Sequence, residues 1–400
     1  MLVNLENHDL DKKYLSKNNV VNLKKKLIYL VLLCIIIIIS FYFAFLTTKL
    51  LKNSEIIINQ NNDLINKLKN LVKKQNYNYG KYTSFSFSNN TLNDVQTEEF
   101  NDNLEKKYIE NQHHFCKSND LFVDKVIDNK LEKVRAYLNN ISFNMLIYNS
   151  TDFVSNSIKE SGSWDKTSTN NLISCLNYYS QKKKLPKNEI TILDIGANVG
   201  WYSLYLAKAG YELYSFEISR INTYILKKNF CLNENLKVTI INKGISIDKG
   251  DEKCILHHPS HNIGNAVILC GENANIPLNN EKNINEVVQF TKLSNYYNFL
   301  SKKNIALIKI DVEGYEGSVI KSGIEFISKY HVPFLFIEFT EDYLKMQGTE
   351  PKELLEIFKL NGYLISNTNF FSKSYLSIKK ILKLKATNLY LVYSKFIDKY

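Results

Sequence analysis

The sequence predicts an α/β protein with a doubly wound, mostly parallel sheet. Three observations predict it. From Asn140 on, apolar β-type runs alternate with helical patterns. One run, TILDIGANVGW at Thr191–Trp201, passes from a strand through a glycine loop into a helix. Two further runs end in acids, at Glu217 and Asp311. Such alternation is typical of parallel sheets covered by helices, whose ligands bind at the carboxyl ends of the strands.

The expected elements follow from these patterns in chain order. The strands are expected at Leu146–Tyr148, Thr191–Ile195, Glu212–Phe216, Lys237–Asn242, Ile305–Ile310, Pro333–Phe339, Tyr363–Ile365 and Asn388–Tyr393. The helices between them are expected at Thr167–Gln181, Val199–Lys208, Arg220–Leu232, Gly317–Phe326 and Pro351–Leu360. The interval Gly250–Val288 holds hairpin-like pieces. The last two strands are joined by a span without a strong helical period, which allows an antiparallel terminal hairpin.

A membrane anchor is expected near the start of the chain. After a polar tail at residues 1–26, Leu27–Leu46 has no charged residue, and its length suits a transmembrane helix of about 20 residues. A buried core helix would show a polar face, and a cleaved signal peptide would have a shorter apolar run. Lys24–Lys26 precede the segment, so the positive-inside rule predicts a cytosolic N-terminus and places the large C-terminal part in the lumen of the ER or Golgi.

The region behind the anchor divides into a stalk, a lead-in and a main domain. Residues 47–103 are expected to be a stalk and linker. The stalk's apolar residues recur every seven positions, so weak self-association is possible; they are Leu50, Ile57, Leu64 and Leu71. Residues 104–139 are expected to be a helical lead-in, since three apolar residues are spaced for one helix face: Leu131, Val134 and Leu138. The main domain then covers residues 140–400.

Composition excludes several classes of function. The net charge of +11 comes mainly from scattered lysines, without a nucleic-acid-binding motif, so no nucleic-acid partner is expected. The six cysteines form no C-x-x-C pair, which speaks against a zinc site or redox dithiol. A histidine cluster, His257, His258 and His261, resembles a metal site, but two of its members are adjacent and expected in a loop, so no metal is predicted.

The glycine loop predicts a nucleoside-cofactor site. Its pattern is D-x-G-x-x-x-G, with Asn198 between the glycines, and it differs from the G-x-G-x-x-G of dinucleotide sites. A carboxylate at the strand end suits a cofactor with a positive group, such as S-adenosylmethionine. Glu217, one strand on, suits a ribose diol. An ordinary glycine turn is the alternative interpretation.

Five segments carry a resemblance to a known family. They are VSNSIKESGSW at Val154–Trp164, LDIGANVGWYSLYLAKAG, the FE of Phe216–Glu217, IKIDVEGYEGSVIKSG around Asp311, and PFLFIEF at Pro333–Phe339. With them, residues 140–395 resemble the FkbM family of S-adenosylmethionine-dependent methyltransferases. The resemblance implies a Rossmann-like class I methyltransferase fold, with a seven-stranded, mostly parallel sheet and an antiparallel terminal hairpin. One departure is Ser294, where the family usually has an aspartate, and this could alter substrate handling or impair activity.

The resemblance also implies roles for particular residues. The first loop would surround the methionine end of the cofactor, through Asp194, Gly196, Asn198 and Gly200. Glu217 would hold the ribose hydroxyls. Residues after the third strand would flank the adenine: Gly244, Ile245 and Ser246. Known members of the family methylate oxygens, often on sugars or on other glycosylated or polyketide-like molecules.

Methyl transfer to a hydroxyl benefits from a base within hydrogen-bond reach. Asp311 and Glu313 are the first candidates, followed by Glu338 and His261. Each has a structural alternative: Glu313 or Glu316 could cap the next helix, and Glu338 could be buried in its strand. Trp201 and Tyr202 could line the pocket or belong to the core. A hydroxyl-bearing sugar, glycan or small molecule is the expected acceptor. A non-catalytic scaffold and a nicotinamide oxidoreductase are the alternative functions.

Overall fold

The computed structural model describes residues 100–116, 130–149, 152–247, 253–258, 266–271 and 284–397. These residues belong to one compact unit, Thr91–Tyr400. The expected tail, the membrane segment Leu27–Leu46, nearly all of the stalk, and His261 lie outside the described residues. Among the helices that are described, none has both the length and the apolar character needed to cross a bilayer.

A seven-stranded sheet forms the centre of the fold, with strand order β13-β14-β12-β11-β3-β4-β5. β14 pairs antiparallel with both of its neighbours, and the other neighbours pair in parallel. The predicted mostly parallel sheet with an antiparallel terminal hairpin is therefore confirmed. Its strands are β3 (Ile190–Ile195), β4 (Glu212–Phe216), β5 (Val238–Ile241), β11 (Asn304–Ile310), β12 (Phe334–Thr340), β13 (Tyr363–Ser366) and β14 (Ala386–Tyr393).

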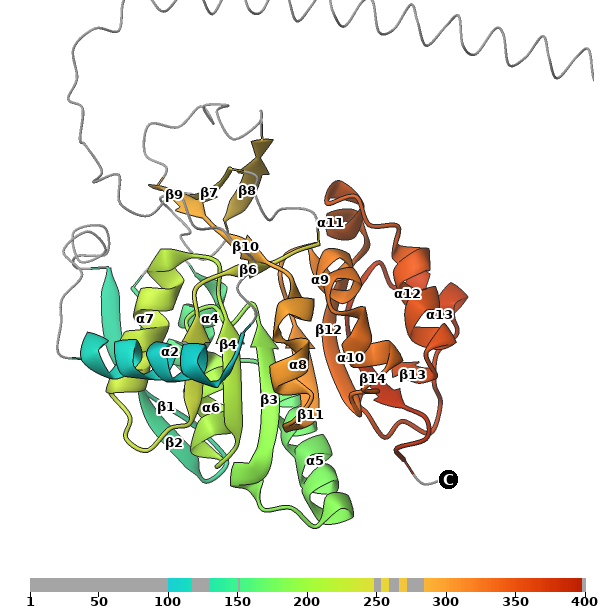
Figure 1. Cartoon of the computed structure of the whole chain (residues 1–400), viewed down its shortest axis with the longest axis horizontal. Coiled ribbons are helices and arrows are strands. Elements are labelled where there is room, and N and C mark those ends of the chain that lie inside the picture. Colours follow the sequence, from blue (N-terminus) through green and yellow to red (C-terminus); the bar gives the residue numbers. More distant parts are fainter. Residues whose placement is uncertain are drawn as a thin grey trace, which may run out of the picture. The chain divides into compact units, whose positions relative to one another are not determined.

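Helices cover both faces of this sheet (Figure 1). Side chains alternate along each strand, so Ile192 packs into one apolar layer and Leu193 into the other. The first layer holds α4 (Phe153–Ser161), α5 (Lys166–Lys183), α6 (Trp201–Lys208) and α7 (Arg220–Cys231). The second holds α8 (Tyr297–Leu300), α9 (Glu316–Ser322), α10 (Ile324–Ser328), α11 (Glu341–Met346), α12 (Pro351–Leu360) and α13 (Ile378–Leu382). Two 3-10 turns, η1 (Lys187–Glu189) and η3 (Leu293–Tyr296), precede β3 and α8.

The lead-in is only partly helical, which corrects the prediction for residues 104–139. Helix α2 spans Asp102–Phe115, but Leu131–Leu138 form strand β1, which pairs antiparallel with β2 (Ile141–Tyr148). The two strands are joined by Asn139 and Asn140, and Asn139 has a φ of +53°. Asparagine tolerates this left-handed conformation, which a two-residue hairpin turn requires. The Asn-Asn pair therefore indicates a hairpin turn, although the apolar spacing before it also fits a helix.

Helix α2 protects the edge of the central sheet. Gln112 is buried, donates to the carbonyl of Val238 at 2.8 Å and accepts from the N–H of Ile240 at 3.1 Å. These bonds satisfy backbone groups of β5 that would otherwise be open on an edge strand. A disulfide between Cys116 and Cys231 joins the end of α2 to the end of α7.

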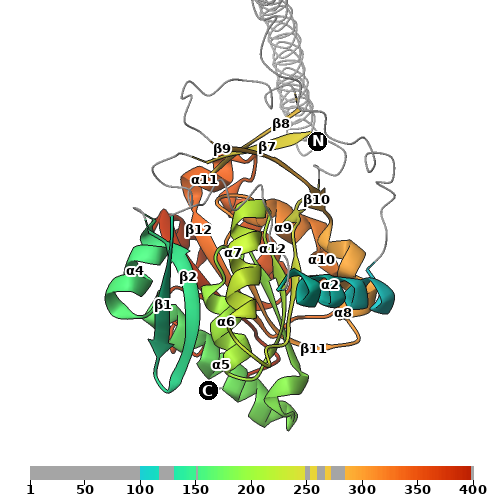
Figure 2. The same cartoon turned by 90° about the vertical axis from the view of Figure 1, so that its left-hand side faces the viewer.

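An additional small sheet lies above the carboxyl ends of the central strands (Figures 1 and 2). It contains β7 (Cys254–His258), β8 (Val267–Cys270) and β9 (Ile284–Val288), paired antiparallel in the order β8-β7-β9. A second disulfide, Cys254–Cys270, links β7 and β8. The chain enters this sheet after β6 (Gly244–Ile245) and leaves it through β10 (Phe290–Thr291), and these two strands pair with one another in parallel.

Candidate active site

The glycine loop folds back onto the end of β4. The N–H groups of Gly196 and Ala197 both donate to the carbonyl of Phe216, at 2.9 and 3.0 Å. Gly196 has a φ of +83°, and a Cβ placed there would lie 1.8 Å from the backbone oxygen of Asp311. Only glycine fits a position that combines this dihedral with such a close approach. The loop thus brings the ends of β3, β4 and β11 together.

Glu217 lies directly beside this loop. Its carboxylate accepts from the N–H of Asn198 at 2.7 Å and from the N–H of Ser219 at 2.9 Å. The side chain is buried, and burial raises its pKa, although the two N–H donors and Lys309 act in the opposite direction. A carboxylate can accept about four hydrogen bonds. Glu217 therefore keeps acceptor capacity for hydroxyl groups after holding the loop.

A buried lysine connects β3 with β11. The ammonium of Lys309 donates to the carbonyl of Gly196 at 2.6 Å and lies 3.3 Å from Asp194 and 3.6 Å from Asp311. Burial alone would lower the pKa of Lys309, but the two carboxylates outweigh it and raise that pKa. Asp194 is also buried and accepts from the hydroxyl of Ser203 at 2.6 Å. Its carboxylate therefore stabilises buried polar groups inside the fold.

Three carboxylates gather at the ends of β11 and β12. Atoms of Asp311, Glu313 and Glu338 lie within 4.8 Å of one another, and they are the one group among the described residues whose spacing could hold a metal ion. Burial, and then the charges of Asp311, Glu313 and Glu316, raise the pKa of Glu338 to about 9. Like charges this close cannot all ionise without a counter-ion. In the protein alone, Glu338 therefore keeps its proton at neutral pH.

Glu316 has a different role from its acidic neighbours. It begins α9, is buried, and accepts from the N–H groups of Val312 and Gly314 at 3.0 and 3.2 Å. Burial is the main cause that raises its pKa to about 7. These bonds fix the turn after β11, and this turn orients Asp311 and Glu313.

A single cavity of about 620 Å³ connects these features. This volume is in the usual range for small-molecule sites. The apolar part of its lining includes Ile245 and four residues that pack in one cluster: Ile218, Leu256, Ile268 and Phe290. The three carboxylates also line it, together with Tyr202, Tyr315 and Tyr343, and the ring of Tyr315 lies 6.1 Å from that of Phe290. Glu217 and the glycine loop lie along the same cavity.

The sequence-predicted residues divide between this cavity and the interior. Those that line it are Gly196, Asn198, Glu217, Gly244, Ile245, Asp311, Glu313 and Glu338. Trp201 and Tyr202 also contribute to its wall, although both are buried. Three predicted residues are not among the lining residues: Asp194, Gly200 and Ser246. Gly200 begins α6 and packs against Leu226, and Ser246 shares a hydrogen bond of 2.9 Å with Ser318.

Residues 194–365 match the family described as methyltransferase FkbM domain. This segment is therefore similar to an FkbM methyltransferase domain. The resemblance inferred from the sequence is thereby confirmed, and the family's cofactor is S-adenosylmethionine. The matched span begins at Asp194 and ends at Ile365, so it includes the glycine loop, Glu217 and the acidic cluster. A search of curated proteins found no match.

Solved structures of methyltransferases align with this chain only loosely. Magnesium protoporphyrin IX methyltransferase from Synechocystis, with bound SAH, is 14% identical, with a TM-score of 0.30 over 62% of this chain and 89% of that chain. A SAM-dependent methyltransferase from Agrobacterium tumefaciens is 9% identical, with a TM-score of 0.33 over 66% of this chain and 70% of that chain. Structural similarity at TM-scores this low does not indicate which residues form the site.

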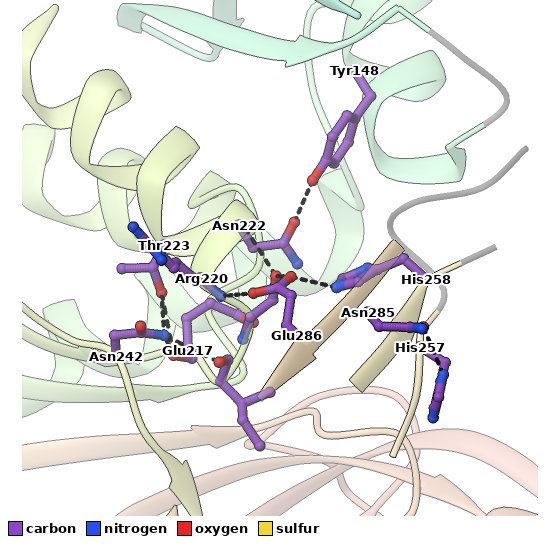
Figure 3. A network of polar contacts seen from close by, with 12 residues as sticks. Tyr148, Glu217, Arg220, Asn222, Thr223, Asn242, His257, His258, Asn285 and Glu286 are labelled. Carbon is purple, nitrogen blue, oxygen red and sulfur yellow. Dashed lines mark hydrogen bonds and ion pairs between the residues drawn. The ribbon is translucent and has the colours of Figure 1, made fainter. Parts of the chain in front are cut away.

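Sequence reasoning missed several residues around the cavity. Lys309 could have been found, because a lysine within the apolar strand IALIKI must have a buried partner. His258 was noted only as part of a histidine cluster. It is buried, lines the cavity and contacts Glu286 at 2.5 Å, whereas His257 contacts Asn285 at 2.7 Å (Figure 3). The two histidines therefore do not share one ligand set.

Ser294, the departure from the family pattern, lies in the η3 turn and is not among the residues that line the cavity.

Proposed function

We propose that this protein is a membrane-anchored methyltransferase that moves a methyl group from S-adenosylmethionine to a hydroxyl of a sugar, glycan or small molecule. One observation carries the proposal: Glu217, the glycine loop and the acidic cluster line the same cavity. A nucleoside site and a set of candidate bases are thereby within reach of one bound ligand.

The residues along the cavity fit this cofactor. The apolar part of the lining suits an adenine ring, and Glu217 retains acceptor capacity for two ribose hydroxyls. The three carboxylates of the acidic cluster suit the positive amino group and sulfonium. When bound, S-adenosylmethionine supplies an electrophilic methyl group. The chain's own contribution is then to align the acceptor oxygen and to take up its proton.

Asp311 is the best placed base in the acidic cluster. Its side chain is 39% exposed and lines the cavity, so an acceptor hydroxyl can approach it. Glu338 retains its own proton at neutral pH, since burial and neighbouring charges raise its pKa to about 9. A neutral Glu338 therefore serves as a hydrogen-bond partner of Asp311 rather than as a base.

The lumen of the secretory pathway is the proposed location of the domain. The described residues include two disulfides, Cys116–Cys231 and Cys254–Cys270, and such bonds persist mainly in oxidising compartments. Asn140 and Asn149, which begin two N-x-[ST] sequons, are exposed. Leu27–Leu46 would be the anchor and would bind the lipid bilayer, and the stalk behind it would allow weak self-association.

Cofactor binding tests the enzymatic proposal. Isothermal titration of the full-length protein in detergent micelles should show binding of S-adenosylhomocysteine. Glu217→Ala should abolish this binding, whereas Glu353→Gln, on the exposed side of α12, should leave it unchanged. The proposal fails if the wild-type protein does not bind, or if both variants bind as the wild type does.

Topology is tested separately. An epitope at the C-terminus should resist protease in sealed microsomes and become sensitive when detergent is added. Digestion without detergent would place the domain in the cytosol and would contradict the proposed location.

A further inference from the structure

The small sheet above the central sheet forms part of the cavity wall. β6 leads into this sheet and β10 leads out of it, and because the two strands pair with one another, the entry and exit of the chain lie side by side. Leu256 and His258 of β7 and Ile268 of β8 line the cavity, and Leu256 and Ile268 pack in one apolar cluster with Ile218 and Phe290. This sheet therefore adjoins the part of the site that suits the nucleoside.

Glu286 of β9 connects this sheet to the start of α7. Its carboxylate accepts from the hydroxyl of Ser219 at 2.9 Å and from the N–H of Arg220 at 2.6 Å. His258 lies 2.5 Å from the same carboxylate and is completely buried. His258 and Glu286 are diagonal neighbours on one face of the β7–β9 pair, since Glu286 lies opposite Leu256. Figure 3 shows these side chains converging beside Glu217.

Ser219 joins this group to the proposed ribose site. Its N–H donates to Glu217 at 2.9 Å, while its hydroxyl donates to Glu286. The same hydroxyl accepts from the N–H of Asn222 at 3.1 Å and caps α7. Glu286 thus holds the buried Ser219 in place, and the N–H of Ser219 in turn holds one oxygen of Glu217.

We propose that Glu286, held in place by His258, is a positioning residue that fixes Glu217 for binding the ribose hydroxyls of the cofactor. The inference rests on the proposed function and extends it to residues outside the glycine loop and the strand ends. Glu286 acts through Ser219 and need not touch the cofactor. If Glu286 loses this function, the protein should lose the part of cofactor affinity that depends on the ribose hydroxyls.

A matched control lies on the same two strands. His257 contacts Asn285 at 2.7 Å, and these residues are directly opposite in the β7–β9 register. Because side chains alternate along a strand, this pair projects from the other face of the sheet. Asn285 is exposed, so Asn285→Ala perturbs the small sheet without touching Ser219.

The test compares two probes on the full-length protein in detergent micelles. The first is S-adenosylhomocysteine, and the second is its 2′,3′-dideoxy analogue, which lacks the hydroxyls assigned to Glu217. Titration calorimetry should show that Glu286→Gln raises the Kd of the first probe about tenfold, as expected for a weakened charged hydrogen bond. The Kd of the dideoxy probe should change by less than about twofold, because the substitution acts only through the hydroxyls that this probe lacks, and coupled contributions do not add. Asn285→Ala should change neither.

Each outcome has a definite meaning. An equal loss for both probes, or no loss for either, would overturn the positioning role, since a general structural role does not distinguish ribose hydroxyls. If Glu286→Gln fails to fold, as judged by circular dichroism, His258→Gln decides by the same ratio. If the wild type binds neither of the two probes, the proposed function is refuted instead, and this inference with it.

Discussion

Replacing Gly196 by alanine should separate two strand ends that the site requires to be in contact. A Cβ at this position would lie 1.8 Å from the backbone oxygen of Asp311, which is roughly 1.6 Å short of the 3.4 Å where ordinary contact begins. The obstacle is backbone, so a change of rotamer cannot relieve it. The ends of β3 and β11 must move apart by a comparable distance.

The cost of this movement can be worked out from the bonds it disturbs. Asp311 donates its N–H to Ile195 at 3.1 Å, and Lys309 donates to the carbonyl of Gly196 at 2.6 Å. A neutral hydrogen bond is worth about 1 kcal/mol and one from a charged donor about 1.5–3 kcal/mol. The positive φ of +83° adds about 1–2 kcal/mol for alanine. The total is about 3.5–6 kcal/mol, a large part of a typical folding free energy of about 5–15 kcal/mol.

Gly348 provides the matched control for this substitution. Its φ is +73°, and a Cβ there would meet no atom within 4 Å. Gly348→Ala should therefore cost only about 1–2 kcal/mol, the conformational part of the penalty. In scanning calorimetry, Gly196→Ala should melt at least roughly 5 °C below Gly348→Ala, and its binding of S-adenosylhomocysteine should be lost. If the two variants melt within about 2 °C of one another and bind equally, the steric argument is wrong.

Three further predictions concern the acidic cluster and the location. Asp311→Asn should lower kcat by about 10²–10⁴-fold, the usual contribution of a general base, while leaving the Kd of S-adenosylhomocysteine within a few-fold; an unchanged kcat would assign the base elsewhere. The pKa of Glu338 is raised from 4.5 to about 9, so between these pH values the folded protein holds a proton that the unfolded chain has lost, and stability falls as pH rises. The free energy of unfolding of Glu338→Gln should therefore equal that of the wild type near pH 4.5 and exceed it by on the order of 1–3 kcal/mol at pH 9. Denaturation curves measure this difference, and a difference of the same size at both pH values would contradict the prediction. Protein expressed in a eukaryotic secretory system should shift in electrophoretic mobility after glycosidase treatment, and Asn140→Gln combined with Asn149→Gln should reduce the shift, whereas protein that carries no glycan would count against a lumenal domain.

Much of the central sheet could be predicted because its signals are local. Buried parallel strands read as short apolar runs, and the run at Thr191–Ile195 differs from the observed strand by one residue. The glycine loop and Glu217 could be assigned to one site, since carboxyl ends of neighbouring parallel strands lie on the same edge of a sheet. Asp311 was expected at this edge for the same reason.

The errors arose where spacing alone was ambiguous. The apolar spacing at Leu131–Leu138 fitted a helix face, but eight residues are also enough for a strand, and the Asn-Asn turn decides for the hairpin. The helix expected at Gly317–Phe326 is two short helices that meet at Gly323. A Cβ on Gly323 would lie 2.5 Å from the side chain of Leu293, so the close packing of a distant segment requires a glycine where the two helices meet.

The charged residues of the site could be predicted only where the surrounding sequence itself indicates that a charge is buried. Lys309 stands within an apolar strand, and this position alone requires a buried acid somewhere in the fold. Glu286 gives no such signal, because it belongs to a strand with alternating exposed and buried residues, INEVV, in which glutamate is ordinary. Its partner His258 is 28 residues away in the sequence, and only the antiparallel register of β7 and β9 brings the two together. Those contacts that connect Glu217 to the small sheet therefore depend on tertiary pairing, and this is why the residues proposed to position the ribose site became visible only in the folded chain.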